Sequence, residues 1–136
     1  MRALVIEDDP NFALLITRFL PDVICMIAEN AERADWLLKS REWDLVWTDL
    51  MLPDSHPKDT IAMVRAHCKN AAVLVCSGAV DNLDEFQADF AVRKDEVMTR
   101  DSMQAAVDTA IANRRKKDPY EKSVESVEAL AKIDKP

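Results

Sequence analysis

The chain has 136 residues, of which 49% are hydrophobic and 32% are charged, and its formal net charge is −7. This length and composition predict one folded domain with its own core, and they exclude a chain that is disordered by composition. The acidic balance argues against a general nucleic-acid binder, and no apolar run reaches the length of a membrane span. Because Met1-Arg2 leads directly into a strand pattern and the three cysteines are scattered, we expect a cytoplasmic protein with reduced thiols and no signal peptide.

The first half of the chain alternates short apolar runs with amphipathic segments. Strands are expected over 3–7, 23–27 and 45–49, where apolar side chains follow one another as in a strand buried on both faces. Helices are expected after Asp9, which precedes a proline, and after Asn30, because both residue types are good N-caps. The apolar faces of these helices are formed by Phe12, Leu15, Ile16 and Phe19 in the first and by Ala34, Leu37 and Leu38 in the second.

The second half continues this alternation. The pattern predicts a helix over 58–67, a strand over 73–77, a short acidic segment over 81–88, a strand over 90–93 and a longer helix over 99–117. Strands that alternate with helices are typical of a parallel sheet covered on both faces. We therefore predict a doubly wound α/β domain with five parallel strands.

Polar side chains stand where four of these strands end. Glu7 and Asp8 come at the end of the first strand, Asp49 ends the third, Ser77 ends the fourth, and Lys94 follows the fifth. Because ligands of an open parallel sheet bind beyond the carboxyl ends of its strands, we expect these residues to gather on one edge.

This set of side chains suits phosphoryl transfer. Clustered carboxylates repel one another unless a cation joins them, and hard oxygen ligands of this kind suit Mg²⁺. A carboxylate can also act as a nucleophile and form an aspartyl phosphate. The charge on the transferred group could then be met by the metal ion, by the Ser77 hydroxyl and by the Lys94 ammonium.

With these motifs in their order along the chain, the sequence resembles the receiver domains of two-component response regulators. The resemblance covers residues 1–117. The segments that carry it are Val5-Ile6-Glu7-Asp8-Asp9, Trp47-Thr48-Asp49-Leu50-Met51-Leu52-Pro53-Asp54, Cys76-Ser77-Gly78 and Arg93-Lys94-Asp95. Each segment alone is a weak signal, whereas four of them at successive strand ends are specific.

The resemblance implies a sheet with the strand order 2-1-3-4-5 and a role for each residue of the site. It implies that Asp49 is the phosphoacceptor, that Asp8 binds Mg²⁺ directly and that Glu7 acts on the metal through water. It further implies that Met51 gives the metal its backbone carbonyl, that Ser77 is the hydroxyl that moves to the phosphoryl group, and that Lys94 pairs with that group.

Two of the departures from the family pattern concern signal output. Most receivers carry an aromatic residue or histidine three positions before the lysine, where this chain has Ala91. Neighbouring strand residues face opposite ways, so Phe90 cannot substitute for it. The segment between Ser77 and Lys94 is also several residues shorter than in most relatives, which predicts a shortened fourth helix.

Single residues of these types also have simpler interpretations. A strand-end Asp is commonly a helix cap, and we assign Asp9 to that role. Outside the motifs, His56 and His67 lie near no plausible partners, and we expect both at the surface. The three tryptophans, which are Trp36, Trp43 and Trp47, are expected to serve packing.

The domain organisation follows from a break at Lys117. Residues 1–117 are expected to form the receiver domain, and 118–136 an extra C-terminal amphipathic helix or tail. Such a helix would dock on its own domain or on a second copy of the chain, giving a homodimer.

We expect a single-domain response regulator that receives its phosphoryl group from a histidine kinase or a histidine phosphotransfer protein. It would act on a protein partner of unknown identity, not on nucleic acid or a membrane. Its only chemistry would be self-phosphorylation from a phosphodonor and slow autodephosphorylation, so it is not classed as an enzyme. A receiver that is part of a longer protein would have the same sequence features.

Two alternatives stay open. The first is a receiver-like interaction module that signals without phosphorylation, which the departures on the output side favour. The second is a metal-dependent phosphatase, but such enzymes usually carry a second Asp two residues beyond the nucleophile, where this chain has Met51.

Overall fold

Five parallel strands form one sheet in the order β2-β1-β3-β4-β5, as the resemblance implies. The structure is a computed structural model that describes residues 1–78 and 88–117. Its strands are β1 (Arg2–Ile6), β2 (Ile24–Ala28), β3 (Leu45–Thr48), β4 (Ala72–Ser77) and β5 (Phe90–Arg93). The expected strands are therefore confirmed, with ends that differ by one residue at most positions.

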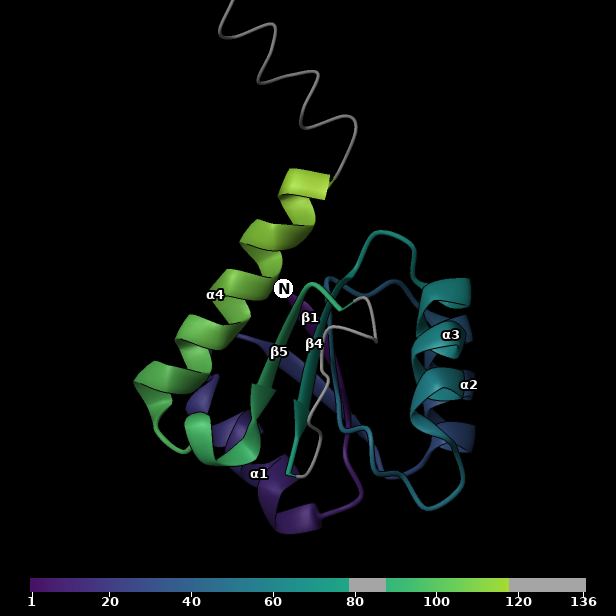
Figure 1. Cartoon of the computed structure of the whole chain (residues 1–136), viewed down its shortest axis with the longest axis horizontal. Helices are drawn as coiled ribbons and strands as arrows, with labels where there is room; N and C mark the ends of the chain where they lie inside the picture. The colour runs from purple at the N-terminus through teal and green to yellow at the C-terminus, as the bar shows by residue number, and fades with distance from the viewer. Residues whose placement is uncertain (79–87, 118–136) are drawn as a thin grey trace, which may run out of the picture.

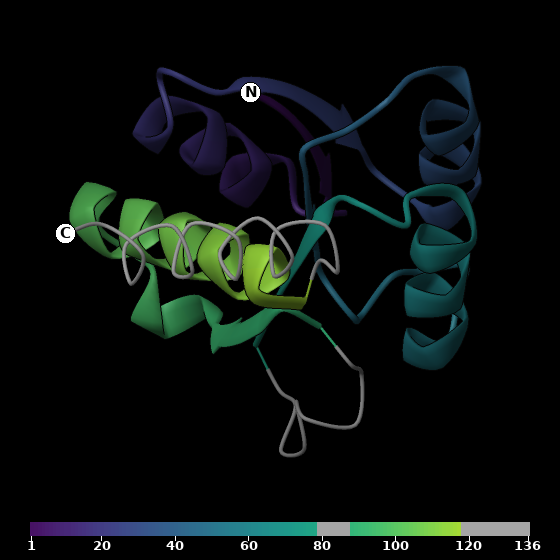
Figure 2. The same ribbon diagram turned by 90° about the horizontal axis from the view of Figure 1, so that it is seen from above.

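Helices cover both faces of this sheet. They are α1 (Pro10–Phe19), α2 (Ala31–Ser40), α3 (Pro57–His67) and α4 (Arg100–Lys117). Figures 1 and 2 show α1 and α4 on one side of the sheet and α2 and α3 on the other. The doubly wound α/β fold class is thus confirmed for the described residues.

The core is divided by the sheet into two apolar clusters. One contains Leu37, Leu38 and Val64 from α2 and α3, and the other contains Ile16 and Met103 from α1 and α4. Every residue of β3 is buried, because this central strand has helices on both faces. Burial of these apolar side chains is the main favourable term that holds the layers together.

The helix starts agree with the predicted caps. The Asp9 carboxylate accepts hydrogen bonds from the N–H groups of Asn11, at 2.9 Å, and Phe12, at 3.4 Å. The Asn30 side chain accepts one from the N–H of Arg33 at 2.8 Å. Each cap satisfies backbone donors that the first turn of a helix leaves without partners.

Trp36 does not serve packing, and that prediction is wrong. Its side chain is 57% exposed, and the Arg33 guanidinium lies 4.7 Å from the ring centroid. Position 36 lies about 100° around the helix from Leu37, on the side that faces solvent. Trp43 and Trp47 are buried, as expected.

Two predicted segments lie wholly or almost wholly outside the described residues. The first is the short acidic segment over 81–88, expected as a shortened helix between β4 and β5, of which only residue 88 is described, and the second is the C-terminal helix or tail, 118–136. Within the two described ranges, no helix combines the length and the apolar character that crossing a membrane requires.

A buried ionic network that the sequence did not indicate holds the start of β5. Asp89 is 4% exposed, and its Oδ2 accepts hydrogen bonds from Arg65 Nη2 of α3 at 3.0 Å and from the Val73 N–H at 2.8 Å. Lys117 Nζ of α4 lies 3.2 Å from Asp89 Oδ1, and Asn113 Nδ2 donates to the Asp89 carbonyl. One carboxylate thereby ties α3 and α4 to the end of the sheet that lies opposite the carboxyl ends.

This network predicts a large stability loss when the carboxylate is removed. Asp89→Ala leaves the Val73 N–H and the Arg65 guanidinium without their acceptor, and should lower the free energy of unfolding by about 3 kcal/mol. Urea denaturation measures this quantity. The control Asp108→Ala removes an exposed carboxylate on α4 and should change it by about 0.5 kcal/mol or less. Equal effects of the two substitutions would contradict a structural role for Asp89.

Candidate functional site

The backbone places two carboxylates directly beyond the ends of neighbouring strands. The N–H of Glu7 donates to the carbonyl of Ala28 at 2.9 Å, and the N–H of Asp49 donates to the carbonyl of Ile6 at 2.8 Å. Both residues therefore continue the hydrogen-bond ladder by one step, which fixes where their side chains start. Glu7 and Asp49 are 1% and 3% exposed.

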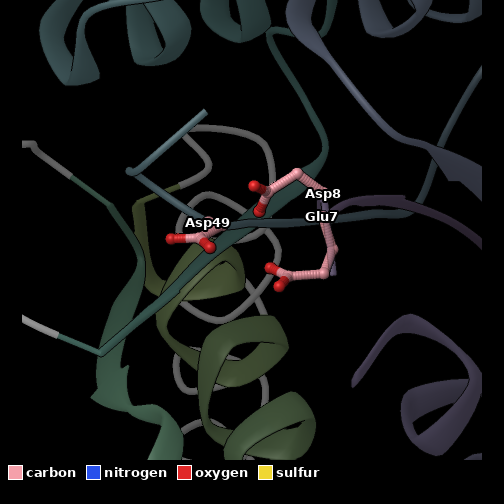
Figure 3. A group of neighbouring side chains, drawn as sticks. All are labelled: Glu7, Asp8 and Asp49. Carbon is pink, nitrogen blue, oxygen red and sulfur yellow. The ribbon is translucent and has the colours of Figure 1, made fainter. Parts of the chain in front are cut away.

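Three carboxylates converge at this edge of the sheet. Glu7, Asp8 and Asp49 each offer an oxygen, and these oxygens lie within 4.8 Å of one another. Figure 3 shows the three side chains pointing toward a common space. Because Asp8 is exposed while the other two are buried, the cluster is open to solvent on one side.

Lys94 joins two of these carboxylates. Its Nζ lies 2.6 Å from Glu7 Oε1 and 3.0 Å from Asp49 Oδ2, and its side chain is 26% exposed. Lys94 opens the 3₁₀ turn η2 (Lys94–Glu96), and the Glu96 carboxylate accepts from the Arg93 N–H at 2.9 Å. The turn brings the lysine back over the sheet edge, where it offsets part of the repulsion between the acids.

The loop after β3 is held at two points. The Met51 N–H donates to Asp49 Oδ1 at 3.0 Å, so both oxygens of Asp49 have a donor. Farther along, the Asp54 carboxylate accepts from the N–H groups of Ala31 at 2.8 Å and Glu32 at 3.1 Å, at the start of α2. Sequence reasoning missed the contact of Asp54, because no local pattern connects this loop to that helix.

Two buried oxygens at the site have no partner within the described part of the chain. They are Ser77 Oγ, on the last residue of β4, and Glu7 Oε2. A buried polar group without a hydrogen bond is costly, so such groups are commonly completed by a ligand, an ion or water. The Ser77 hydroxyl is free to donate to a bound oxyanion.

The electrostatics of the site give each charged group a distinct protonation behaviour. Burial raises the pKa of Glu7 to about 7, against the opposing effect of its hydrogen bond with Lys94. Burial would also raise the pKa of Asp49, but hydrogen bonds from the Met51 N–H and Lys94 leave it below its ordinary value. Burial opposes the charge on Lys94, yet its two carboxylate partners raise its pKa. Asp49 is therefore ionised at neutral pH, whereas Glu7 titrates near it.

The donor set fits a divalent hard cation. All three side chains offer carboxylate oxygens, no nitrogen or sulfur ligand accompanies them, and the buried Glu7 Oε2 is without a partner in the residues that the structure covers. Mg²⁺ prefers such ligands and keeps part of its water shell, which an open cluster permits.

Phe12 is a further neighbour of the site. The Lys94 Nζ lies 4.9 Å from the centroid of its ring. Sequence reasoning assigned Phe12 only to the apolar face of its helix, and no motif relates it to a lysine at the far end of the chain.

Receiver domains and response regulators are among the solved structures with a similar fold. A CheY-like response regulator receiver domain protein from Methanospirillum hungatei matches with 15% sequence identity and a TM-score of 0.74, over 86% of this chain and 98% of that one. The response regulator TrrA from Thermotoga maritima, solved in complex with Mg²⁺-BeF, matches with 25% identity and a TM-score of 0.70, over 80% and 97%. A response regulator from Burkholderia pseudomallei, solved with a phosphorylated aspartic acid, a calcium ion and citrate, matches with 23% identity and a TM-score of 0.69, over 96% and 74%.

These similarities are similarities of fold. No family model and no curated protein sequence matches the chain. The matched structures nevertheless share the five-stranded parallel architecture over most of their own length and most of this chain. The predicted fold is thereby confirmed, and its open carboxyl edge is where the acidic cluster lies.

The pKa of Glu7 predicts how stability depends on pH. Its folded-state value of about 7 lies above its ordinary value of 4.5, so the stabilising contribution is complete below about 4.5 and is lost as the pH rises through 7. In EDTA, the unfolding free energy of the wild type should therefore fall relative to that of Glu7→Gln between pH 5 and pH 8.

Urea denaturation at these two pH values measures the difference. Excess Mg²⁺ should reduce or reverse the fall, because a bound cation favours the ionised carboxylate. The control Glu29→Gln, which alters an exposed side chain on the loop before α2, should keep the pH dependence of the wild type. A wild type and a Glu7→Gln variant with parallel pH profiles would show that Glu7 ionises normally.

Proposed function

We propose, from the premise that this chain has the fold of response regulator receiver domains, that it accepts a phosphoryl group on Asp49 from a histidine kinase or a histidine phosphotransfer protein. The observation that carries this proposal is the position of the Lys94 ammonium, 3.0 Å from Asp49 and 2.6 Å from Glu7 at the open end of the sheet. The proposed domain is 1–117, and it would signal through contacts with a protein partner in the cytoplasm.

Asp49 is the proposed nucleophile because its carboxylate is ionised and held in place. The Met51 N–H fixes Oδ1, and Lys94 contacts Oδ2. An Asp49 oxygen would form the new bond to phosphorus as the bond between phosphorus and the donor imidazole nitrogen breaks. The imidazole leaves with the electron pair and takes a proton from solvent, and Asp49 becomes an acyl phosphate.

The proposed metal ion is Mg²⁺, held by Asp8 and Asp49, by Glu7 through water, and by the backbone carbonyl of Met51. When bound, it would neutralise part of the charge on the phosphoryl oxygens. Support comes from the close approach of the three carboxylates and from the metal named with the similar structure of TrrA.

Lys94 and Ser77 are proposed to hold the transferred group. Lys94 already lies beside Asp49, so its ammonium can pair with a phosphoryl oxygen without a large movement. The Ser77 hydroxyl has no partner among the described residues and can donate to another oxygen. The chain would turn over only its own phosphoryl group, by slow hydrolysis, and would not act as an enzyme on other molecules.

In most receiver domains, the aromatic side chain of the fifth strand moves together with the hydroxyl residue of the site. We propose that this chain carries the signal from the site to the output surface in another way. Ala91 packs with the apolar cluster on the α2 and α3 side, while Phe90 packs with the cluster on the α1 and α4 side. Phe90 thus faces away from the position that Ala91 occupies. This observation also favours the second candidate function, an interaction module that signals without phosphate.

Acceptance of a phosphoryl group can be tested by intact-mass spectrometry after incubation with acetyl phosphate. The protein should gain one phosphoryl group in Mg²⁺ and none in excess EDTA, because the clustered acids repel an anionic donor. Asp49→Asn should abolish the gain. Asp9→Asn should retain it, since asparagine can still cap α1.

Phosphorylation of Asp49→Asn, or equal phosphorylation in EDTA, would show that the acceptor or its metal dependence is wrongly assigned. A wild type that gains no phosphoryl group from any donor, yet still binds a protein partner, would favour the interaction module.

The proposed signalling route predicts where the protein responds to a phosphoryl analogue. Beryllofluoride with Mg²⁺ should shift the amide NMR signals near Ser77 more than those over 90–93, because position 91 carries no ring and the Phe90 ring packs on the other side of the sheet. Ser77→Ala should reduce the response, whereas Ala91→Gly should leave it nearly unchanged. Large shifts centred on 90–93 in a Ser77→Ala variant would rule out this route.

A further inference from the structure

We propose that Phe12 is a positioning residue that holds the Lys94 ammonium at the carboxylate edge through the face of its ring. The effect on phosphorylation rests on the proposed function, whereas the contact itself does not. The Lys94 Nζ lies 4.9 Å from the ring centroid, inside the range of about 6 Å over which a cation is attracted to an aromatic face.

The ring is rigidly placed. Phe12 lies in the first turn of α1, its N–H donates to the Asp9 cap at 3.4 Å, and its side chain is 7% exposed. It belongs to the apolar cluster that includes Val97 and Met103, from the segment after η2 and from α4. A lysine side chain has a flexible stem of four carbons and three N–H donors, so its ammonium group needs several contacts to be held in one position.

The ring differs from the other partners of Lys94 because it carries no net charge. Glu7 and Asp49 draw Lys94 to the site, but both carboxylates are proposed to bind a metal ion, and one is to carry the phosphoryl group. Those events change their charge and compete for their oxygens. The ring face is unaffected by such changes, so it can keep Lys94 at the edge while the carboxylates exchange partners.

The burial of the pair makes this contact stronger than an ordinary surface one. Arg33 over Trp36 has a similar distance, 4.7 Å, but its ring is 57% exposed and no functional group lies beside it in the described contacts. Cation–π attraction grows as the pair is removed from water. Phe12 and Lys94 therefore form the aromatic contact that can influence the site.

The contact can be tested by NMR of the Lys94 side chain in the full-length protein without any phosphodonor. The aromatic ring current should move the Lys94 ε-methylene signals upfield in the wild type. Phe12→Leu, which keeps an apolar side chain, should remove this shift, and Phe12→Tyr, which keeps the ring face, should retain it. Phe19→Leu removes a ring at the other end of α1 and should also retain it.

A second measurement tests the consequence for the proposed function. The rate of phosphorylation by acetyl phosphate in Mg²⁺ should fall about three- to tenfold in Phe12→Leu, as expected for loss of one cation–π contact, and stay near the wild-type rate in Phe12→Tyr. Amide spectra and thermal unfolding establish that each variant is folded. If the leucine variant does not fold, Phe12→Tyr still tests the proposal. This variant must then show the Lys94 ring-current shift and the phosphorylation rate of the wild type, and loss of either one overturns the proposal.

Each outcome decides a separate point. An unchanged Lys94 signal in Phe12→Leu overturns the proposed contact. A lost signal with an unchanged rate overturns the positioning role. If the wild type itself is not phosphorylated, the proposed function has failed, and the NMR comparison still decides whether Phe12 holds Lys94.

Discussion

The mutual repulsion of three carboxylates at one edge of the sheet is the constraint on which the rest of this site depends. Glu7 and Asp49 are buried within reach of Asp8, and such a cluster is stable only where cations or hydrogen-bond donors offset its charge. In the described structure Lys94 supplies that charge, and the Met51 N–H supplies a donor. Any anion that approaches Asp49 would therefore have to replace or share these contacts.

The position of Lys94 depends in turn on β5, which is fixed at both ends by charged contacts. At its start, the buried Asp89 binds Arg65 of α3 and Lys117 of α4. At its end, Lys94 binds the acids beyond β1 and β3. The two networks lie at opposite ends of one short strand. The loop that carries Met51 is anchored separately, by the contact of Asp54 with the start of α2.

The sequence alone predicts the strands, the described helices and the gathering of polar residues at one edge. Each of these follows from local periodicity and from the rule that ligands of a parallel sheet bind beyond the carboxyl ends of its strands. The sequence does not predict which individual residues far apart in the chain contact one another. Asp89 and its partner Arg65 are separated by 24 positions, and no periodicity relates them. Trp36 was misjudged because its residue type suggests burial while its place on α2 faces solvent. Phe12 was correctly assigned to a buried face, but periodicity shows that a side chain is buried and not which group it touches.

The central claim is that Asp49, among the clustered acids, becomes the acyl phosphate. Treatment of the acetyl-phosphate-reacted protein with borohydride converts an aspartyl phosphate into homoserine, and peptide mass spectrometry then locates the modified position. The account predicts homoserine at position 49, with Asp8, Asp9 and Asp54 unmodified, and only in samples that contained Mg²⁺. Homoserine at one of those other positions, or none at any position in a sample whose intact mass shows a phosphoryl group, would contradict it.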